Sequence, residues 1–288
     1  MASETLEIRP MRLADAPGVY ALCARVLFSP HPDLDEATVR ERTLARVEHL
    51  AATDPGGVWV AEDGGTIVGA AMALVREGIW GFSLYAVDEA LQQRGVGRRL
   101  LDAALAYGAE RRAHGWIILS SEHPGAMRRY ARAGFALQPA LAAAGIADLT
   151  RAPDAAARVE DAGPAGIELA DRIGRAVRGA GHGPDLAVAL AGGGRLLVYE
   201  DRAFALLRES QVALLAATDE EAATTVLWGG LVTAPPGTTA IVDFMTAAQQ
   251  WAITACLDAR LPLSPEGPVC TKGRLGPLTP YLPNGAYL

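Results

Sequence analysis

Hydrophobic and polar residues follow two different periods along the first half of the chain. Period-two or continuous apolar runs predict strands, whereas apolar residues spaced three and four apart predict helices. The predicted strands cover residues 6–10, 58–62, 66–70 with an extension to 79, 82–87, 116–120, and a further strand that begins at 135. The predicted helices cover residues 16–28, 35–51, 95–113 and 124–133. This order indicates an α/β protein in which helices flank a sheet.

A similar order of elements returns in the second half. Residues 147–165 are rich in Ala, Pro, Asp and Arg and lack periodicity, which predicts a linker. Predicted helices then cover residues 167–177, 220–231 and 247–257, and predicted strands cover residues 195–199, 203–207, 212–216 and 240–244. Four residues are identical when residues 126–139 are aligned with residues 252–265. We therefore predict a duplication, with one domain at 1–146 and a second at 166–288.

Composition narrows the class of protein. The chain has 288 residues, half of them hydrophobic, which is enough for a large core. A net charge of −7 argues against a nucleic-acid partner, and no apolar run is long enough to span a membrane. The polar, acidic start at residues 1–5 does not resemble a signal peptide, and the three cysteines are scattered without metal-ligand spacing. We expect a cytoplasmic monomer or homodimer with no metal site.

The strongest chemical signal is a glycine turn between the strand at 82–87 and the helix that begins at 95. A helix N-terminus presents free N–H groups and the positive end of the helix dipole, which suits a phosphate or pyrophosphate. Gly95 and Gly97 remove side chains that would block such a ligand. Arg94, Arg98 or Arg99 can add positive charge. The candidate cofactor-binding residues of this turn are Gln92, Gln93, Arg94, Gly95, Val96, Gly97 and Arg98.

A second motif follows the strand at 116–120, and the two together resemble the GNAT superfamily of N-acyltransferases. The first matches the family pattern Gln/Arg-x-x-Gly-x-Gly/Ala. The second matches Asn-x-x-Ala-x-x-x-Tyr-x-x-x-Gly-Phe, with His123 in place of the asparagine, then Ala126, Tyr130, Gly134 and Phe135. The similarity covers about residues 5–140, and the opening residues 8–15 also fit the family's first strand and turn. The second half resembles, more loosely, the degenerate partner domain of tandem GNAT proteins.

This resemblance implies a fold and a cofactor. The GNAT fold has a mixed, mostly antiparallel central sheet flanked by helices, here expected twice in tandem. The expected acyl donor is acetyl-CoA or another acyl-CoA, whose pantetheine arm mimics a strand beside the backbone of Tyr85, Ala86 and Val87. The side chains of Ser83 and Tyr85 then alternate toward the acceptor. With Ser121 at the mouth of the same cleft, they are the candidate substrate-binding residues.

The resemblance also assigns acid–base roles. Tyr130 occupies the position of the family's general acid, and a phenol with a pKa of about 10 is protonated at neutral pH. The general base could be Glu122, His123 or Asp88, which follow the two central strands. His123 replaces an asparagine that usually contacts the CoA arm, so it is a candidate for cofactor binding or for the base.

The expected activity is transfer of an acyl group to a primary amine of a small molecule by direct attack of the nitrogen. Two alternatives stay open, a non-catalytic acyl-CoA sensor or assembly protein and a peptide N-acetyltransferase. In the second half, Glu220, Glu221 and Ala222 replace the glycine turn, and Cys256 replaces the tyrosine. We therefore do not expect that half to bind CoA in the same way. The tail at 280–288 is expected to dock as an edge segment or simply to pack as a chain end.

Overall fold

The computed structural model describes residues 6–27 and 35–287. The chain divides into two compact units, Met1–Ala113 with Tyr287 and His114–Ala286 with Leu288, which we call the N-terminal and C-terminal units. Residue 28, the expected end of the first helix, lies outside the described residues. The domain limits at 146 and 166 stay a prediction.

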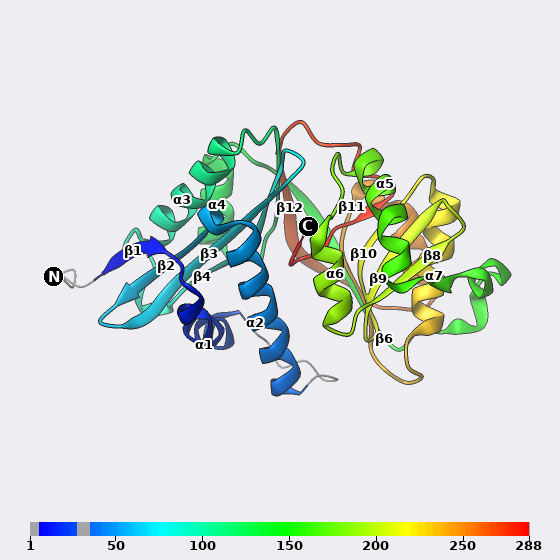
Figure 1. Ribbon diagram of the computed structural model, residues 1–288. Helices are drawn as coiled ribbons and strands as arrows, with labels where there is room; N and C mark the ends of the chain where they lie inside the picture. The colour runs from blue at the N-terminus through cyan, green and yellow to red at the C-terminus, as the bar shows by residue number, and fades with distance from the viewer. Residues whose placement is uncertain (1–5, 28–34, 288) are drawn as a thin grey trace. The chain divides into compact units, whose positions relative to one another are not determined.

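The N-terminal unit contains a four-strand antiparallel meander (Figure 1). Its strands, in spatial as well as chain order, are β1 (Glu7–Pro10), β2 (Val58–Asp63), β3 (Thr66–Arg76) and β4 (Ile79–Val87). Its helices are α1 (Ala16–Val26), α2 (Glu36–Thr53) and α3 (Val96–Glu110). Helix α1 packs on β3 and β4, and α3 packs on β2 and β3.

Asp54 ties three elements of the N-terminal unit together. Its side chain is 1% exposed and accepts hydrogen bonds from Val75 N at 2.9 Å, Arg76 Nη1 at 2.8 Å and Tyr107 Oη at 2.8 Å. These bonds join the end of α2 to β3 and to α3. The pKa of the Tyr107 phenol is raised, because burial and the neighbouring Asp54 carboxylate both disfavour its ionised form. The network fixes the helix that follows the glycine turn.

Among the described residues of the C-terminal unit, the strands follow the spatial order β5-β12-β6-β11-β10-β9-β8-β7, and β13 pairs with β10. Only β10 and β11 run parallel among the pairs described there. The strands are β5 (Gly115–Leu119), β6 (Ala136–Gly145), β7 (Glu160–Asp161), β8 (Arg195–Tyr199), β9 (Ala203–Arg208), β10 (Gln211–Ala217), β11 (Ala240–Thr246), β12 (Leu263–Gly273) and β13 (Tyr281–Leu282). The helices are α4 (Pro124–Arg132), α5 (Ile167–Val177), α6 (Pro184–Ala191), α7 (Glu220–Thr233) and α8 (Gln250–Asp258).

Strands of the two predicted halves are interleaved in this sheet. β6, from the first half, pairs with β11 of the second, as in Ala143 opposite Val242. β12, from the second half, pairs with β5 of the first, as in Thr271 opposite Ile117. β6 and β12 also pair with each other. Each half therefore completes its sheet with a strand that the other half supplies.

The predicted fold class, a mixed and mostly antiparallel sheet flanked by helices, is confirmed. The expected linker contains short 3₁₀ turns and the edge strand β7. The pattern missed α6, β12 and β13. β12 contains Pro265 and Pro268, which cannot donate to a sheet ladder, and a bulge between Glu266 and Val269 accommodates this stretch. The helix expected from 247 begins as a 3₁₀ turn, Ala247–Gln249, before α8.

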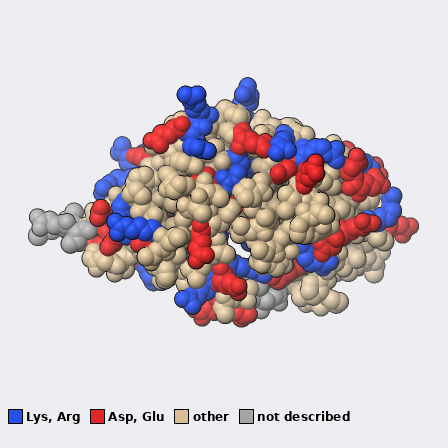
Figure 2. Space-filling model, in the orientation of Figure 1, with Lys and Arg blue, Asp and Glu red and all other residues tan. Residues whose placement is uncertain are grey.

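Basic and acidic side chains of the described residues are interspersed on the face drawn in Figure 2. Among residues 6–27 and 35–287, no helix combines the length and the apolar character needed to cross a bilayer.

Candidate active site

The glycine turn lies between β4 and α3 in the N-terminal unit. Asp88 begins it by accepting a hydrogen bond from Ala90 N at 3.1 Å, and Gln93 follows with a φ of +63°. Gly95 is the N-cap of α3, with a φ of +87° and no capping side chain. The first-turn amides of α3 are therefore not satisfied by a side-chain cap. This is a helix start that can accept an anion.

Arginine side chains surround this helix start. Arg94, Arg98 and Arg99 are exposed, whereas Val96 and Gly97 are buried against the unit. Arg98 also pairs with Asp102 one turn further on, at 3.5 Å between Nε and Oδ2. The turn therefore combines open backbone donors with exposed positive charge, a combination that suits a diphosphate group.

The predicted substrate strand is the last part of β4. Ser83 is 6% exposed, its carbonyl accepts a hydrogen bond from Arg46 Nη2 at 2.6 Å, and among the described residues its Oγ has no partner. Tyr85 is half-buried, with its ring 5.2 Å from that of Phe82. Ala86 and Val87 are buried and lead directly into the glycine turn. Ser83 is thus a buried hydroxyl with unused hydrogen-bonding capacity, which a bound polar group could satisfy.

The second motif lies in the C-terminal unit, on the turn from β5 into α4. Ser121 and Glu122 are exposed after the strand. His123 caps α4, since its Nδ1 accepts hydrogen bonds from Gly125 N at 3.2 Å and Ala126 N at 3.3 Å. This bonding assigns the ring proton of a neutral His123 to Nε2. The arrangement favours His123 as a cap and hydrogen-bond donor, because a base at this position would have to give up its cap.

Tyr130 is held rigidly on α4. Its side chain is 3% exposed, and its ring lies edge-on to Phe135 with 6.4 Å between centroids. The Phe135 amide donates to the Tyr130 carbonyl at 3.1 Å, and Gly134 makes the required turn with a φ of +87°. Lys272 of β12 donates to Ala133 O at 2.9 Å. The Tyr-x-x-x-Gly-Phe spacing therefore fixes the ring position.

The structure adds Glu266, a carboxylate that no motif in the sequence indicates. Its Oε2 accepts a hydrogen bond from Phe244 N at 3.1 Å, at the irregular stretch of β11 where Phe244 has a φ of +56°. The next residue, Gly267, packs so closely on the end of β5 that an added Cβ would lie 1.9 Å from Ser120 O. Glu266 is thereby placed beside the turn that carries Glu122.

The surroundings of Glu266 change its acidity. Burial, followed by repulsion from Asp243 and Glu122, raises the pKa of Glu266 to about 7, although the Phe244 N–H opposes the shift. Burial also raises the pKa of Asp243, against a hydrogen bond from Gln211 Nε2 at 2.7 Å. Perturbed carboxylates of this kind concentrate at functional sites. No local motif could have revealed Glu266, because its neighbours come from β5 and β11, distant in the chain.

Within each unit, the predicted residues therefore gather in one place. The N-terminal unit brings together Ser83, Tyr85, Ala86 and Val87 with the glycine turn. The C-terminal unit brings Ser121, Glu122 and His123 next to the start of the helix that carries Tyr130. The residue roles themselves stay predictions.

Comparison with known proteins gives a family and a fold. Residues 19–135 match the model of the acetyltransferase (GNAT) family. A Pyrococcus horikoshii protein classed provisionally as an acetyltransferase has a similar structure, with a TM-score of 0.80, 16% identity, and coverage of 100% of this chain and 98% of the other. A GCN5-related N-acetyltransferase from Kribbella flavida has a TM-score of 0.60 and 17% identity, with coverage of 93% and 72%. At these identities the structures show a shared fold. No curated protein sequence matches the chain.

Proposed function

Since residues 19–135 match the model of the acetyltransferase (GNAT) family, we propose that this protein transfers an acyl group from acetyl-CoA, or another acyl-CoA, to a primary amine of a small molecule. The observation that carries the proposal is the start of α3 at Gly95, which leaves backbone donors without a side-chain cap. The acyl-CoA would supply an activated thioester. The backbone from Gln93 to Arg98 would bind its diphosphate, and the β4 backbone from Tyr85 to Val87 would pair with its pantetheine arm.

Substitution of Gly95 by valine tests the binding turn. Gly95 has a φ of +87°, which costs an L-residue about 1–2 kcal/mol. We expect Gly95→Val to weaken acetyl-CoA binding about tenfold or more in calorimetry, because the helix start shifts and a side chain faces the ligand. Gly65→Val is the matched control, since Gly65 has a φ of +83° and equally open space for a Cβ. Equal weakening in both variants would contradict the assignment.

The reaction needs a proton donor and a proton acceptor. The amine nitrogen attacks the thioester carbon, the new C–N bond forms, and the C–S bond breaks to release CoA thiolate. We assign the donor to Tyr130, whose phenol would give its proton to that thiolate. Positioning on α4 through the Phe135 contact supports this role.

We assign the acceptor of the amine proton to Glu266. A carboxyl with a pKa of about 7 is a more effective base near neutral pH than an ordinary carboxyl. His123 is occupied as a helix cap through Nδ1. Glu122 is exposed, and its negative charge helps to raise the pKa of Glu266.

This assignment predicts the pH dependence. Glu266 accepts a proton only when ionised, so kcat/KM should rise with pH and level off above a pKa near 7. Glu266→Gln should lower kcat/KM about 100-fold or more and abolish the rise of kcat/KM with pH. Glu122→Gln should move the rise of kcat/KM to lower pH, because it removes one negative charge that raises the pKa of Glu266. An unchanged pH dependence of kcat/KM in Glu266→Gln would show that another group is the base.

Turnover is the direct test of the proposed activity. Acetyl-CoA is incubated with the protein and a panel of primary amines, and release of the CoA thiol is followed. We expect thiol release that depends on the amine and acetylated amine as the product. Tight acetyl-CoA binding without turnover of any amine would favour a non-catalytic sensor. Turnover restricted to peptide amines would move the acceptor to that class.

A further inference from the structure

The second half of the chain has a counterpart of each element that forms the glycine-turn site. The series β8, β9, β10, α7, β11, α8 and β12 repeats the order of β2, β3, β4, α3, β5, α4 and β6. Helix α7 follows β10 as α3 follows β4. The last residues of β10, Leu215–Ala217, thereby correspond to Tyr85–Val87, the backbone that we assign to the pantetheine arm.

We propose that the chain fills this counterpart site with its own residues, so that each chain binds one acyl-CoA. The C-terminal segment, residues 278–286, takes the place of the cofactor's extended arm. The side chain of Asp219 takes the place of its diphosphate. This inference rests on the proposed function for what the first site binds, and every contact that supports it lies in the C-terminal unit.

The first support is a gap between strands that the tail occupies. β10 and β11 are parallel, and in the part of the chain that the structure describes they pair only at Gln211–Ile241 and Val212–Val242. Further along β10, β13 takes over, with Leu215 opposite Leu282 and Ala216 opposite Tyr281. β13 also contacts β11. A strand of the protein thus inserts where the family places a strand-like cofactor arm.

The tail is held there by side chains and is buried. Gln249 donates from Nε2 to Leu278 O at 2.8 Å and accepts from Tyr281 N through Oε1 at 3.3 Å. Asn284 Nδ2 donates to Ala213 O at 3.0 Å. Tyr281 and Leu282 are each 1% exposed. A free cofactor would have to displace all of these contacts.

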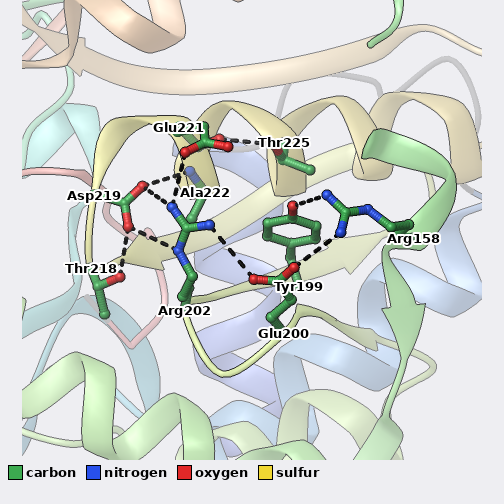
Figure 3. A network of polar contacts seen from close by, with 9 residues as sticks. All are labelled: Arg158, Tyr199, Glu200, Arg202, Thr218, Asp219, Glu221, Ala222 and Thr225. Atoms are coloured by element: carbon green, nitrogen blue, oxygen red, sulfur yellow. Dashed lines mark hydrogen bonds and ion pairs between the residues drawn. The ribbon is translucent and has the colours of Figure 1, made fainter. Parts of the chain in front are cut away.

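The second support is the helix start, which is closed in α7 (Figure 3). Asp219 Oδ1 accepts a hydrogen bond from Ala222 N at 2.9 Å and so caps the helix. Arg202 donates to Asp219 Oδ1 at 2.8 Å and to Glu221 Oε2 at 3.1 Å. Thr218 Oγ1 donates to Asp219 Oδ2 at 2.9 Å. The chain's own carboxylates therefore occupy the position that an anion would take, whereas α3 starts without a side-chain cap.

Hydrogen exchange on the full chain tests the proposal. Without ligand, amides in peptides covering residues 211–222 and 278–286 should already be protected, and acetyl-CoA should leave them unchanged. Peptides covering 83–98 should gain protection when acetyl-CoA is added. Fast exchange at 211–217 without ligand, or new protection there on addition of acetyl-CoA, would overturn the proposal. Absence of any gain at 83–98 would instead count against the proposed function.

Two adjacent glutamines provide a matched pair of variants. Gln249 is buried and holds the tail, whereas Gln250 is exposed and, within residues 6–27 and 35–287, bonds only to Ala247 O of its own turn at 3.3 Å. Gln249→Ala should speed exchange at 211–217 and 278–284 about tenfold, because it leaves buried backbone groups of the tail unpaired. Gln250→Ala should leave both peptides as in the wild type. Equal exchange in the two variants would show that the tail is not what protects β10.

Discussion

A fragment that ends at residue 146 is expected to lose cooperative folding and acetyl-CoA binding, although it contains every residue of the family match at 19–135. The reason is the interleaved sheet of the C-terminal unit. β6 pairs with β11 and β12, and both lie beyond residue 146. β5 also loses its pairing with β12. Unpaired backbone groups and exposed apolar faces would leave the second motif without a scaffold.

Thermal unfolding and calorimetry with acetyl-CoA check this prediction. The control is the full chain with a protease site inserted after Arg151, an exposed residue in the stretch expected to be a linker. After cleavage, the two pieces should stay associated and unfold as the intact protein does, because all strands are still present. A fragment 1–146 that melts cooperatively and binds acetyl-CoA would contradict the role of the interleaved strands.

Tyr130→Phe is expected to lower kcat by about 100- to 1,000-fold with little change in acetyl-CoA affinity or in stability. The phenylalanine ring keeps the packing against Phe135 and removes only the hydroxyl proton that we assign to the leaving thiolate. Steady-state kinetics with a turned-over amine, together with a thermal melt, measures both effects.

Tyr107→Phe is the matched control, since Tyr107 is also a buried tyrosine on a helix. Its hydroxyl donates to the buried Asp54 carboxylate at 2.8 Å, so its loss should destabilise the fold by about 1–3 kcal/mol and leave kcat nearly unchanged. Unchanged kcat in Tyr130→Phe would remove Tyr130 as the acid. A loss of kcat in both variants alike would point to a general effect of destabilisation.

The sequence predicts what is local in this fold. Residues 167–177 form a helix with the predicted limits, and the glycine turn leads from β4 into α3 as expected. These features depend on periodicity, caps and turn residues within a short window. The two motifs that carry the family resemblance are local in the same sense, and a family model covering 19–135 agrees with them.

What the sequence could not show depends on pairing between distant segments. β12 lacks a recognisable strand pattern, because prolines and glycines interrupt it, and its place between β5 and β6 comes only from the sheet. Glu266 was therefore not selected, since its raised pKa comes from burial in the sheet and from the charges of Asp243 in β11 and Glu122 after β5. The tail was expected to dock as an edge segment, but nothing local indicated β10 as the strand with which it pairs.

We propose that the amides at the start of α3 hold the diphosphate of an acyl-CoA. Calorimetric titration of the pure full-length protein with acetyl-CoA tests it most directly. We expect saturable binding with one acetyl-CoA per chain, weakened in Gly95→Val but not in Gly65→Val. No binding to the wild-type protein, or binding that Gly95→Val leaves intact, would contradict it.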